Sequence, residues 1–176
     1  KDKANAGSNL MHLNRMLARI SDKKAVQSLV DKLAAPYDSL PEAHFAMGVA
    51  AAGAEDLMRA QGEFQKALQQ RPDWEIAELA YAQLLAKTSP QNAIESLDEF
   101  LARKPDARDA RVALARLLIS ERKYDAARAQ FDRLLKDAPD NPEFVYPVAM
   151  LALQQGDAAT ARSQLEKLLK SDFQDK

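Results

Sequence analysis

The sequence contains no cysteine, so disulfide bonds, thiolate metal sites and thiol chemistry are excluded. Glycine is scarce, at 5 of 176 residues, and no glycine-rich phosphate-binding loop is present. Long apolar runs are also missing, because nearly uncharged stretches such as residues 45–54 are short. A membrane-spanning helix needs about 20 such residues, so we expect no direct membrane insertion.

A charge excess of either sign is lacking as well. The 25 basic and 26 acidic side chains leave a formal charge of -1, which provides no general field to attract nucleic acid or an anionic membrane. Aromatic residues make up only 6% of the chain, and they stand mostly at apolar repeat positions such as Phe64 and Phe131. Base stacking needs exposed aromatic rings, so we expect no nucleic acid partner.

Catalytic groupings are absent too. The two histidines, His12 and His44, have no second histidine or carboxylate at a spacing that places both on one helix face. Acidic clusters such as Glu55-Asp56 fall near expected turns, where they favour helix N-termini. No nucleophile elbow and no metal-ligand spacing occur. We therefore expect a protein that is not an enzyme and that needs no metal or cofactor.

What the sequence does contain is an internal repeat of 33 or 34 residues. One alanine series and one large apolar series share the steps 33, 34 and 34: Ala60, Ala93, Ala127, Ala161 and Phe64, Leu97, Phe131, Leu165. A third series of small residues and a fourth of closing residues accompany them: Gly48, Ala82, Ala115, Ala149 and Pro72, Pro105, Pro139, Phe173. The small-residue series steps by 34, 33 and 34, which places a one-residue deletion in the turn at residues 87–90.

Each period contains two amphipathic stretches, for example residues 109–120 and 124–137, with apolar residues three and four apart. Two helices and two turns fit into one period. The small residues allow the two helices of a hairpin to approach closely, and the large apolar residue fills the seam to the next hairpin. Burial of each such side chain stabilises the stack by roughly 1.5–3 kcal/mol.

A weaker unit precedes the four regular ones, because Leu13, Ala25 and Leu29 lie 35 residues before Gly48, Ala60 and Phe64. Leu13 is larger than its counterparts, so we expect the helices of this unit to lie farther apart or to cross at another angle. The sequence then predicts five hairpins in one continuous stack, with these boundaries: 8–40 for the degenerate unit, then 41–73, 74–107, 108–141 and 142–175.

Helix ends carry recognisable signals. Ser89 and Asn141 each precede a proline and are expected to cap the following helix. Gly53 and Gly156 are expected to close first helices in the left-handed conformation. Pro147 lies beyond the first turn of its expected helix, which predicts a kink or a late start there.

These spacings resemble the tetratricopeptide repeat: a small residue in the first helix, alanine and a large apolar residue four later in the second, and a closing proline. The unit at residues 41–72 matches best, although His44 stands where the family has an early tryptophan. The resemblance implies an all-α, right-handed superhelical solenoid of about five helical hairpins. It also implies a scaffold that binds a partner protein or peptide.

In tetratricopeptide arrays the second, fifth, ninth and twelfth places of each first helix face the concave surface. Transferred to this chain, the candidate partner-binding residues are Phe45, Val49, Ile76, Leu79, Gln83, Val112, Arg116, Ile119, Tyr146 and Met150. The groove of this family that holds a C-terminal carboxylate needs lysine at the fifth place and asparagine at the ninth, and no repeat supplies them. The apolar character instead suits a helix or an extended hydrophobic segment, with Arg116 as a polar anchor. A segment of the same protein is the alternative occupant.

Three short runs, at residues 41–46, 71–75 and 105–109, resemble a narrower group. In proteobacteria, a lipid-anchored periplasmic adaptor built of such hairpins partners a carboxyl-terminal processing protease and brings cell-wall hydrolases to it as substrates. The start at Lys1, with no initiating Met or apolar signal region, suggests a piece of a longer precursor. The resemblance implies an outer-membrane-anchored protein of the periplasm. The alternatives are an architectural spacer in a larger solenoid and a cytoplasmic scaffold.

Overall fold

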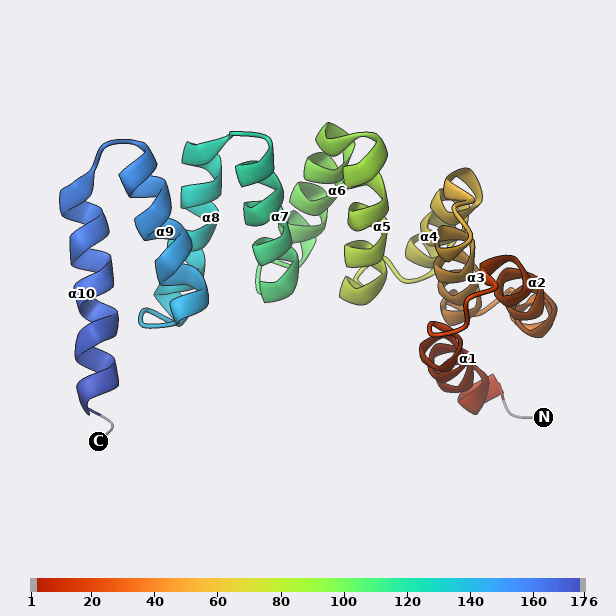
Figure 1. Ribbon diagram of the computed structural model, residues 1–176. Helices are drawn as coiled ribbons and strands as arrows, with labels where there is room; N and C mark the ends of the chain where they lie inside the picture. The colour runs from red at the N-terminus through yellow and green to blue at the C-terminus, as the bar shows by residue number, and fades with distance from the viewer. Residues whose placement is uncertain (1–2, 175–176) are drawn as a thin grey trace. The chain divides into compact units, whose positions relative to one another are not determined.

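The computed structural model describes residues 3–174, and within that range the chain forms ten α-helices, one short 3-10 helix and no strand (Figure 1). Residue 175, the expected end of the last repeat, lies outside the described residues. The helices are α1 (Lys3–Leu17), α2 (Lys23–Ala34), α3 (Pro41–Gly53), α4 (Leu57–Gln70), α5 (Glu75–Thr88), α6 (Pro90–Arg103), α7 (Arg108–Ser120), α8 (Tyr124–Asp137), α9 (Pro142–Gln154) and α10 (Ala158–Gln174). The 3-10 helix is η1 (Ala35–Tyr37). The all-α prediction is confirmed.

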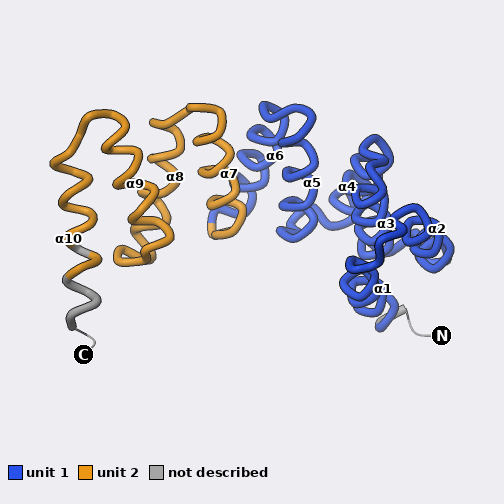
Figure 2. The backbone as a smooth tube through the Cα atoms, in the orientation of Figure 1, with its two compact units in different colours: residues 1–105 blue, residues 106–176 orange. Residues whose placement is uncertain are grey.

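The chain divides into two units, residues 1–105 and residues 106–176 (Figure 2). In the first unit α3 pairs with α4 and α5 pairs with α6, while α4 also packs against α5. In the second unit α7 pairs with α8 and α9 pairs with α10, while α8 packs against α9. Each unit is therefore built of helical hairpins that stack on their neighbours.

The repeat positions occupy equivalent places in the helices. Ala60, Ala93, Ala127 and Ala161 are the fourth residues of α4, α6, α8 and α10, and each is at most 1% exposed. One turn later, Phe64, Leu97 and Phe131 are at most 2% exposed. The spacing of small and large apolar residues thus predicted the core of the hairpins correctly.

The turns inside the hairpins confirm the deletion. Three residues separate α3 from α4, α7 from α8 and α9 from α10, whereas Ser89 alone separates α5 from α6. Because α5 has 14 residues where α3, α7 and α9 have 13, this hairpin is shorter by one residue. In the middle of the three longer turns stand Glu55, Arg122 and Gly156, with φ of 63°, 58° and 80°. Gly156 is therefore left-handed as expected. Gly53 closes α3 as expected, since it is the last residue of that helix, but the left-handed conformation falls on Glu55 instead.

The expected helix signals hold in part. Asn141 caps α9, since its side-chain Oδ1 accepts a hydrogen bond from the Glu143 N–H at 2.9 Å. Ser89 makes no such side-chain bond, so the prediction that its side chain caps α6 is wrong. Its backbone both ends α5 and begins α6. The late start at Pro147 is also wrong, because α9 begins at Pro142 and continues through Pro147. A kink there stays a prediction.

The closing prolines explain where the second helices end. α4, α6 and α8 each stop two residues before Pro72, Pro105 or Pro139. Proline has no N–H to continue the helical hydrogen bonds, and it restricts the residue before it. Where Phe173 replaces the proline, α10 continues to Gln174.

The first hairpin has a different register from the expected one. Val26 and Val30 are 9% and 0% exposed, whereas Ala25 is exposed and Leu29 is 43% exposed. Val26 and Val30 lie 34 residues before Ala60 and Phe64, and they occupy the equivalent repeat positions in α2. The assignment of Ala25 and Leu29 to the core was therefore wrong by one residue.

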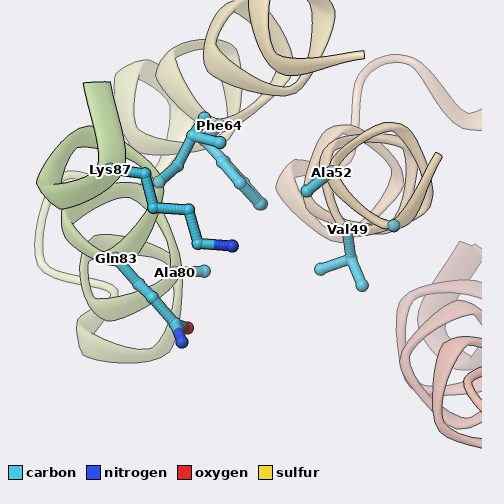
Figure 3. Close-up of a pocket in the computed structure, with 8 residues that line it drawn as sticks. Val49, Ala52, Phe64, Ala80, Gln83 and Lys87 are labelled. Carbon is cyan, nitrogen blue, oxygen red and sulfur yellow. The ribbon is translucent and has the colours of Figure 1, made fainter. Parts of the chain in front are cut away.

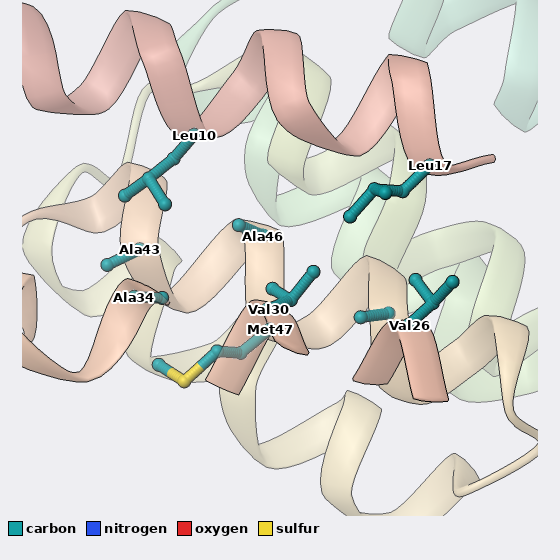
Figure 4. Close-up of a cluster of buried hydrophobic side chains, with 9 residues drawn as sticks. Leu10, Leu17, Val26, Val30, Ala34, Ala43, Ala46 and Met47 are labelled. Carbon is teal, nitrogen blue, oxygen red and sulfur yellow. The ribbon is translucent and has the colours of Figure 1, made fainter. Parts of the chain in front are cut away.

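The helices of this first hairpin are also arranged differently. α1 packs mainly against α3 and makes little contact with α2. Figure 4 shows Leu10 and Leu17 of α1 on one side of α3 and residues of α2, including Val30, on another. The looser pairing of α1 with α2 agrees with the expectation that this unit is degenerate. The division of the chain into five repeats at the stated boundaries stays a prediction.

Candidate functional site

A pocket of about 270 Å³ opens between the C-terminal halves of α3 and α5 (Figure 3). Its lining includes Val49 and Ala52 from α3, Phe64 from α4, and Ala80, Gln83 and Lys87 from α5. Most of these side chains are apolar, and the two polar ones belong to α5. The pocket lies in the first unit and draws on two successive first helices.

Helical spacing explains why these residues meet. Val49 and Ala52 are three apart, and Ala80, Gln83 and Lys87 are separated by three and four, so each group lies on one face of its helix. Both first helices thus present one side to the pocket.

The ring of Phe64 enters between them because α3 carries glycine at position 48. A Cβ atom on Gly48 would lie 2.7 Å from two ring carbons of Phe64. The small residue of the repeat therefore also shapes the pocket.

The candidate residues of the first unit take different positions. Val49 and Gln83 line the pocket. Ile76 is 55% exposed and Leu79 is half-buried, both on α5. Phe45 is only 6% exposed, and its ring centroid lies 5.8 Å from that of Phe64 and 5.0 Å from that of Trp74. Its assignment to the exposed partner-binding surface is corrected: Phe45 belongs to the core.

The candidate residues of the second unit also differ among themselves. Tyr146 and Met150, one turn apart on α9, are 55% and 63% exposed. Ile119 is half-buried, while Val112 is 8% exposed and is likewise corrected to a core position. Arg116 is exposed, and its guanidinium donates to Glu143 Oε1 at 2.8 Å. It therefore already has a carboxylate partner within the chain.

A buried polar pair inside the α3–α4 hairpin was missed by the sequence analysis. His44 Nδ1 lies 2.7 Å from Glu63 Oε2, and Lys66 Nζ lies 3.0 Å from Glu63 Oε1. Burial alone raises the pKa of Glu63, but the hydrogen bonds from His44 and Lys66 outweigh it and bring this pKa below its ordinary value. The pair connects the two helices of the hairpin.

Equivalent pairs occur in the next two hairpins. Ser96 Oγ donates to Glu78 Oε1 at 2.6 Å, and Arg111 Nη1 donates to Gln130 Oε1 at 2.9 Å. Glu78 and Arg111 stand at the place of His44, four residues before the small residue of the first helix. The partners precede the large apolar residue of the second helix by one. A comparison of the residues at these two repeat positions across the hairpins would have revealed the pairs.

Replacing Glu78 with glutamine is expected to raise the free energy of unfolding at neutral pH by about 1 kcal/mol. Burial raises the pKa of Glu78 above 4.5, helped by the nearby Glu99, while the Ser96 hydroxyl and Arg103 offset it only in part. Ionisation of Glu78 therefore opposes folding. The stability that its protonated carboxyl group contributes is complete below pH 4.5 and is lost as the pH rises through the raised pKa.

Thermal unfolding of both proteins at about pH 4 and about pH 7 tests the role of this carboxyl group. The gain in the glutamine variant should appear only at the higher pH. An equal gain at both pH values would show that the charge of Glu78 is not its cause.

Other kinds of site find no support in the part of the chain that the structure describes. Its His, Asp and Glu side chains form no group of three that could hold a metal ion. None of its helices combines the length and the apolar character needed to cross a membrane. The candidate site combines the pocket between α3 and α5 with the exposed apolar side chains of the first helices.

Comparison with known proteins identifies the family of this chain. The family model described as tetratricopeptide repeat matches residues 84–146 and 118–176, which together cover more than half of the sequence. The chain belongs to the tetratricopeptide repeat family, and its hairpins are those of a tetratricopeptide solenoid. No curated protein matches it in a sequence search.

Solved structures share the fold. MamA from Desulfovibrio magneticus is 17% identical, with a TM-score of 0.72 and 98% of each chain covered. PilF of Pseudomonas aeruginosa is also 17% identical, with a TM-score of 0.73, 94% of this chain and 76% of that chain covered. YrrB, described as having an unusual peptide-binding site, is 19% identical, with a TM-score of 0.64 and coverage of 89% and 81%. At these identities the similarity establishes the fold alone.

Proposed function

We propose that this chain is a scaffold that binds segments of another protein through the exposed apolar faces of its first helices. The observation that carries the proposal is the face of α9 on which Tyr146, Met150 and Leu153 are 55%, 63% and 49% exposed. Apolar side chains that cluster on a surface mark interaction sites more often than scattered ones do. Helical spacing puts these three on one side of α9, where a helix or an extended apolar segment can pack.

The first unit offers a second surface with the same character. Ile76 is 55% exposed on α5, one turn before Ala80, which lines the pocket together with Val49 and Ala52. The fold likeness to YrrB, a protein with a peptide-binding site, supports a role in peptide binding. We therefore assign partner contact to Val49, Ile76, Leu79, Gln83, Ile119, Tyr146 and Met150.

Site-specific photo-cross-linking tests this function. A benzophenone amino acid placed at Met150 should give a discrete cross-linked partner in the source cell, because this position lies on the exposed α9 face. The same amino acid at Lys136, an exposed position on α8, is the matched control and should give none. Equal labelling from both positions, or no discrete product from Met150, would favour the architectural spacer.

We infer further that the full-length protein is an adaptor for a carboxyl-terminal processing protease and its substrates, in the periplasm and anchored to the outer membrane. The runs at residues 41–46, 71–75 and 105–109 support this inference. The coding sequence upstream of Lys1 should encode a signal peptide that ends in a lipidated cysteine, and the protease should co-purify with the full-length protein. A cytoplasmic start would instead favour the cytoplasmic scaffold.

A further inference from the structure

The helix α1 lies on the inner face of α3 instead of forming a close hairpin with α2. Glu42 and Phe45 hold the second and fifth places of α3, the places that were expected to face the concave surface. A Cβ atom on Gly7 would lie only 2.9 Å from Glu42 Cδ, and Met11 packs against the cluster that contains Phe45. α1 therefore covers places of α3 that a partner was expected to contact.

Burial of the same repeat places differs between α3 and α9. At the fifth place, Phe45 is 6% exposed and Tyr146 is 55% exposed. At the ninth place, Val49 is half-buried and Met150 is 63% exposed. Met11 packs against the cluster to which Phe45 and Val49 belong. α1 thus occupies on α3 the kind of surface that is exposed on α9.

The contacts of α1 with α3 follow a simple pattern. Gly7, Met11 and Asn14 are four and three residues apart, so they lie on one face of α1. Gly7 allows close approach of the two helices, and Met11 supplies the large apolar side chain. The Asn14 amide Nδ2 donates to the Ala46 carbonyl oxygen at 3.3 Å. A small residue, a large apolar residue and an amide therefore define what this surface accepts.

Two leucines anchor α1 beside this face. Leu10 and Leu17 are 5% and 9% exposed, and Figure 4 shows both directed from α1 toward α3. They are seven residues apart, two helical turns, and they pack in the same cluster as Ala43 and Ala46 of α3. The docking of α1 therefore depends on a few apolar side chains at well-defined positions.

The remaining packing of α1 is incomplete. A pocket of about 470 Å³ lies beside it, lined by Met11 and Arg15 of α1 and by residues that include Glu42 and Trp74. The 15 residues of α1 include three asparagines, a glycine and a serine, all of them poorer helix formers than alanine. A helix of this length is only marginally stable on its own. Separation of α1 from α3 is therefore a local opening that leaves the α3–α4 hairpin in place.

We infer that α1 is a displaceable cover on the inner face of α3. The occupant of this helix-binding surface is α1 of the same chain, and a partner helix reaches the surface only by displacing α1. Such a helix needs the α1 pattern: a small residue, a large apolar residue four positions later and an amide three positions after that. The inference rests on the proposed function, because it adds a covered surface to the exposed ones.

A fluorescently labelled peptide with the sequence of residues 3–17 tests this inference against the full chain, with binding followed by fluorescence anisotropy. Leu10→Ala in the chain should tighten binding of the peptide about tenfold or more, because the weakened α1 leaves the surface open in more molecules. Leu10→Ala in the peptide should weaken binding about tenfold or more instead. Opposite effects of one substitution in the chain and in the peptide are the signature of competition for one surface.

A disulfide bond then fixes the cover in place. The chain has no cysteine of its own, and a Cβ atom on Gly7 would lie 3.0 Å from Glu42 Cγ. Cysteines at positions 7 and 42 therefore bring their Cβ atoms within the roughly 3.5–4.5 Å that a disulfide requires. In the Leu10→Ala chain, Gly7→Cys with Glu42→Cys should lose peptide binding when oxidised and regain it when reduced. Both states lack the Glu42 carboxylate, so the comparison isolates the disulfide.

His12→Ala is the matched control, because His12 is exposed on α1. It should leave binding unchanged in the chain and in the peptide. Circular dichroism confirms that each variant is folded, and non-reducing electrophoresis shows whether the disulfide forms within one chain, as expected, or between two.

The outcomes separate this inference from the proposed function. Failure of the peptide to bind the folded Leu10→Ala chain, or binding that the disulfide leaves unchanged, would overturn the inference. A disulfide between two chains would assign the surface to a second copy and would overturn it as well. The cross-link from Met150, on α9 in the other unit, should persist when α1 is fixed. Its absence in every state of the chain would count against the proposed function and leave the competition result standing.

Discussion

Replacing Phe131 with alanine is expected to lower the free energy of unfolding by about 3–5 kcal/mol. Phe131 is 0% exposed and is the large apolar residue of α8, one turn after Ala127 in the seam of the second unit. Removal of the ring takes away its buried area and leaves a cavity that rigid helices fill only in part. Urea unfolding followed by circular dichroism measures the loss.

The repeat supplies a matched control for this substitution. Leu165 holds the same place in α10, yet it is only partly buried. Leu165→Ala should therefore cost about 1 kcal/mol, because the side chain has less buried surface to lose. Equal losses at the two positions would show that the place in the repeat, rather than burial, determines the energy.

The core of the regular hairpins could be predicted because it depends on local periodicity. Ala60 and Phe64 lie on one face of α4 whatever the rest of the chain does, and the same holds at Ala93 and Leu97 of α6. Helix pairing then follows from which face is small and apolar. These positions needed no information about distant contacts.

The first hairpin could not be predicted in the same way, because α2 carries two apolar stripes one residue apart. One consists of Ala25, Leu29 and Leu33, and the other of Val26, Val30 and Ala34. Both have the same helical spacing, so the pattern alone cannot choose between them. Packing against α3 decides, and it buries the stripe that contains Val30.

The candidate site was predictable only as a set of helix faces. Phe45, Leu79, Val112 and Tyr146 all hold the fifth place of a first helix, yet their exposure ranges from 6% for Phe45 to 55% for Tyr146. The difference comes from neighbours: the Trp74 ring lies 5.0 Å from the ring of Phe45. A place in a repeat fixes the direction of a side chain, whereas the residues of adjacent elements determine whether a partner can reach it.

The buried polar pairs were missed for a related reason. His44 and Glu63 lie 19 residues apart on facing helices, so a search for partners along one helix cannot find them. Once two helices pair by their small residues, side chains near those positions come within hydrogen-bond distance. Buried polar groups need such partners, which makes the facing helix the place to search.

Replacing Gly48 with alanine is expected to lower the free energy of unfolding by about 1–3 kcal/mol. The added methyl carbon would lie 2.7 Å from the Cδ1 and Cε1 atoms of Phe64, closer than carbon atoms can approach. Phe64 is 2% exposed and packs on Phe45, so its ring can retreat only toward the pocket between α3 and α5, at the cost of its contact with Phe45. Guanidinium chloride unfolding measures the change.

Gly62→Ala is the matched control, and it is expected to stabilise the protein by about 1 kcal/mol, because alanine is the better helix former. Nothing lies within 4 Å of a Cβ atom at Gly62, in the interior of α4. Combining Gly48→Ala with Phe64→Leu should then cost less than the sum of the two single changes, since the smaller side chain relieves the clash. An additive result would mean that contact between α3 and the Phe64 ring does not limit how closely this hairpin packs. The same conclusion would follow if Gly48→Ala and Gly62→Ala changed the free energy of unfolding in the same direction.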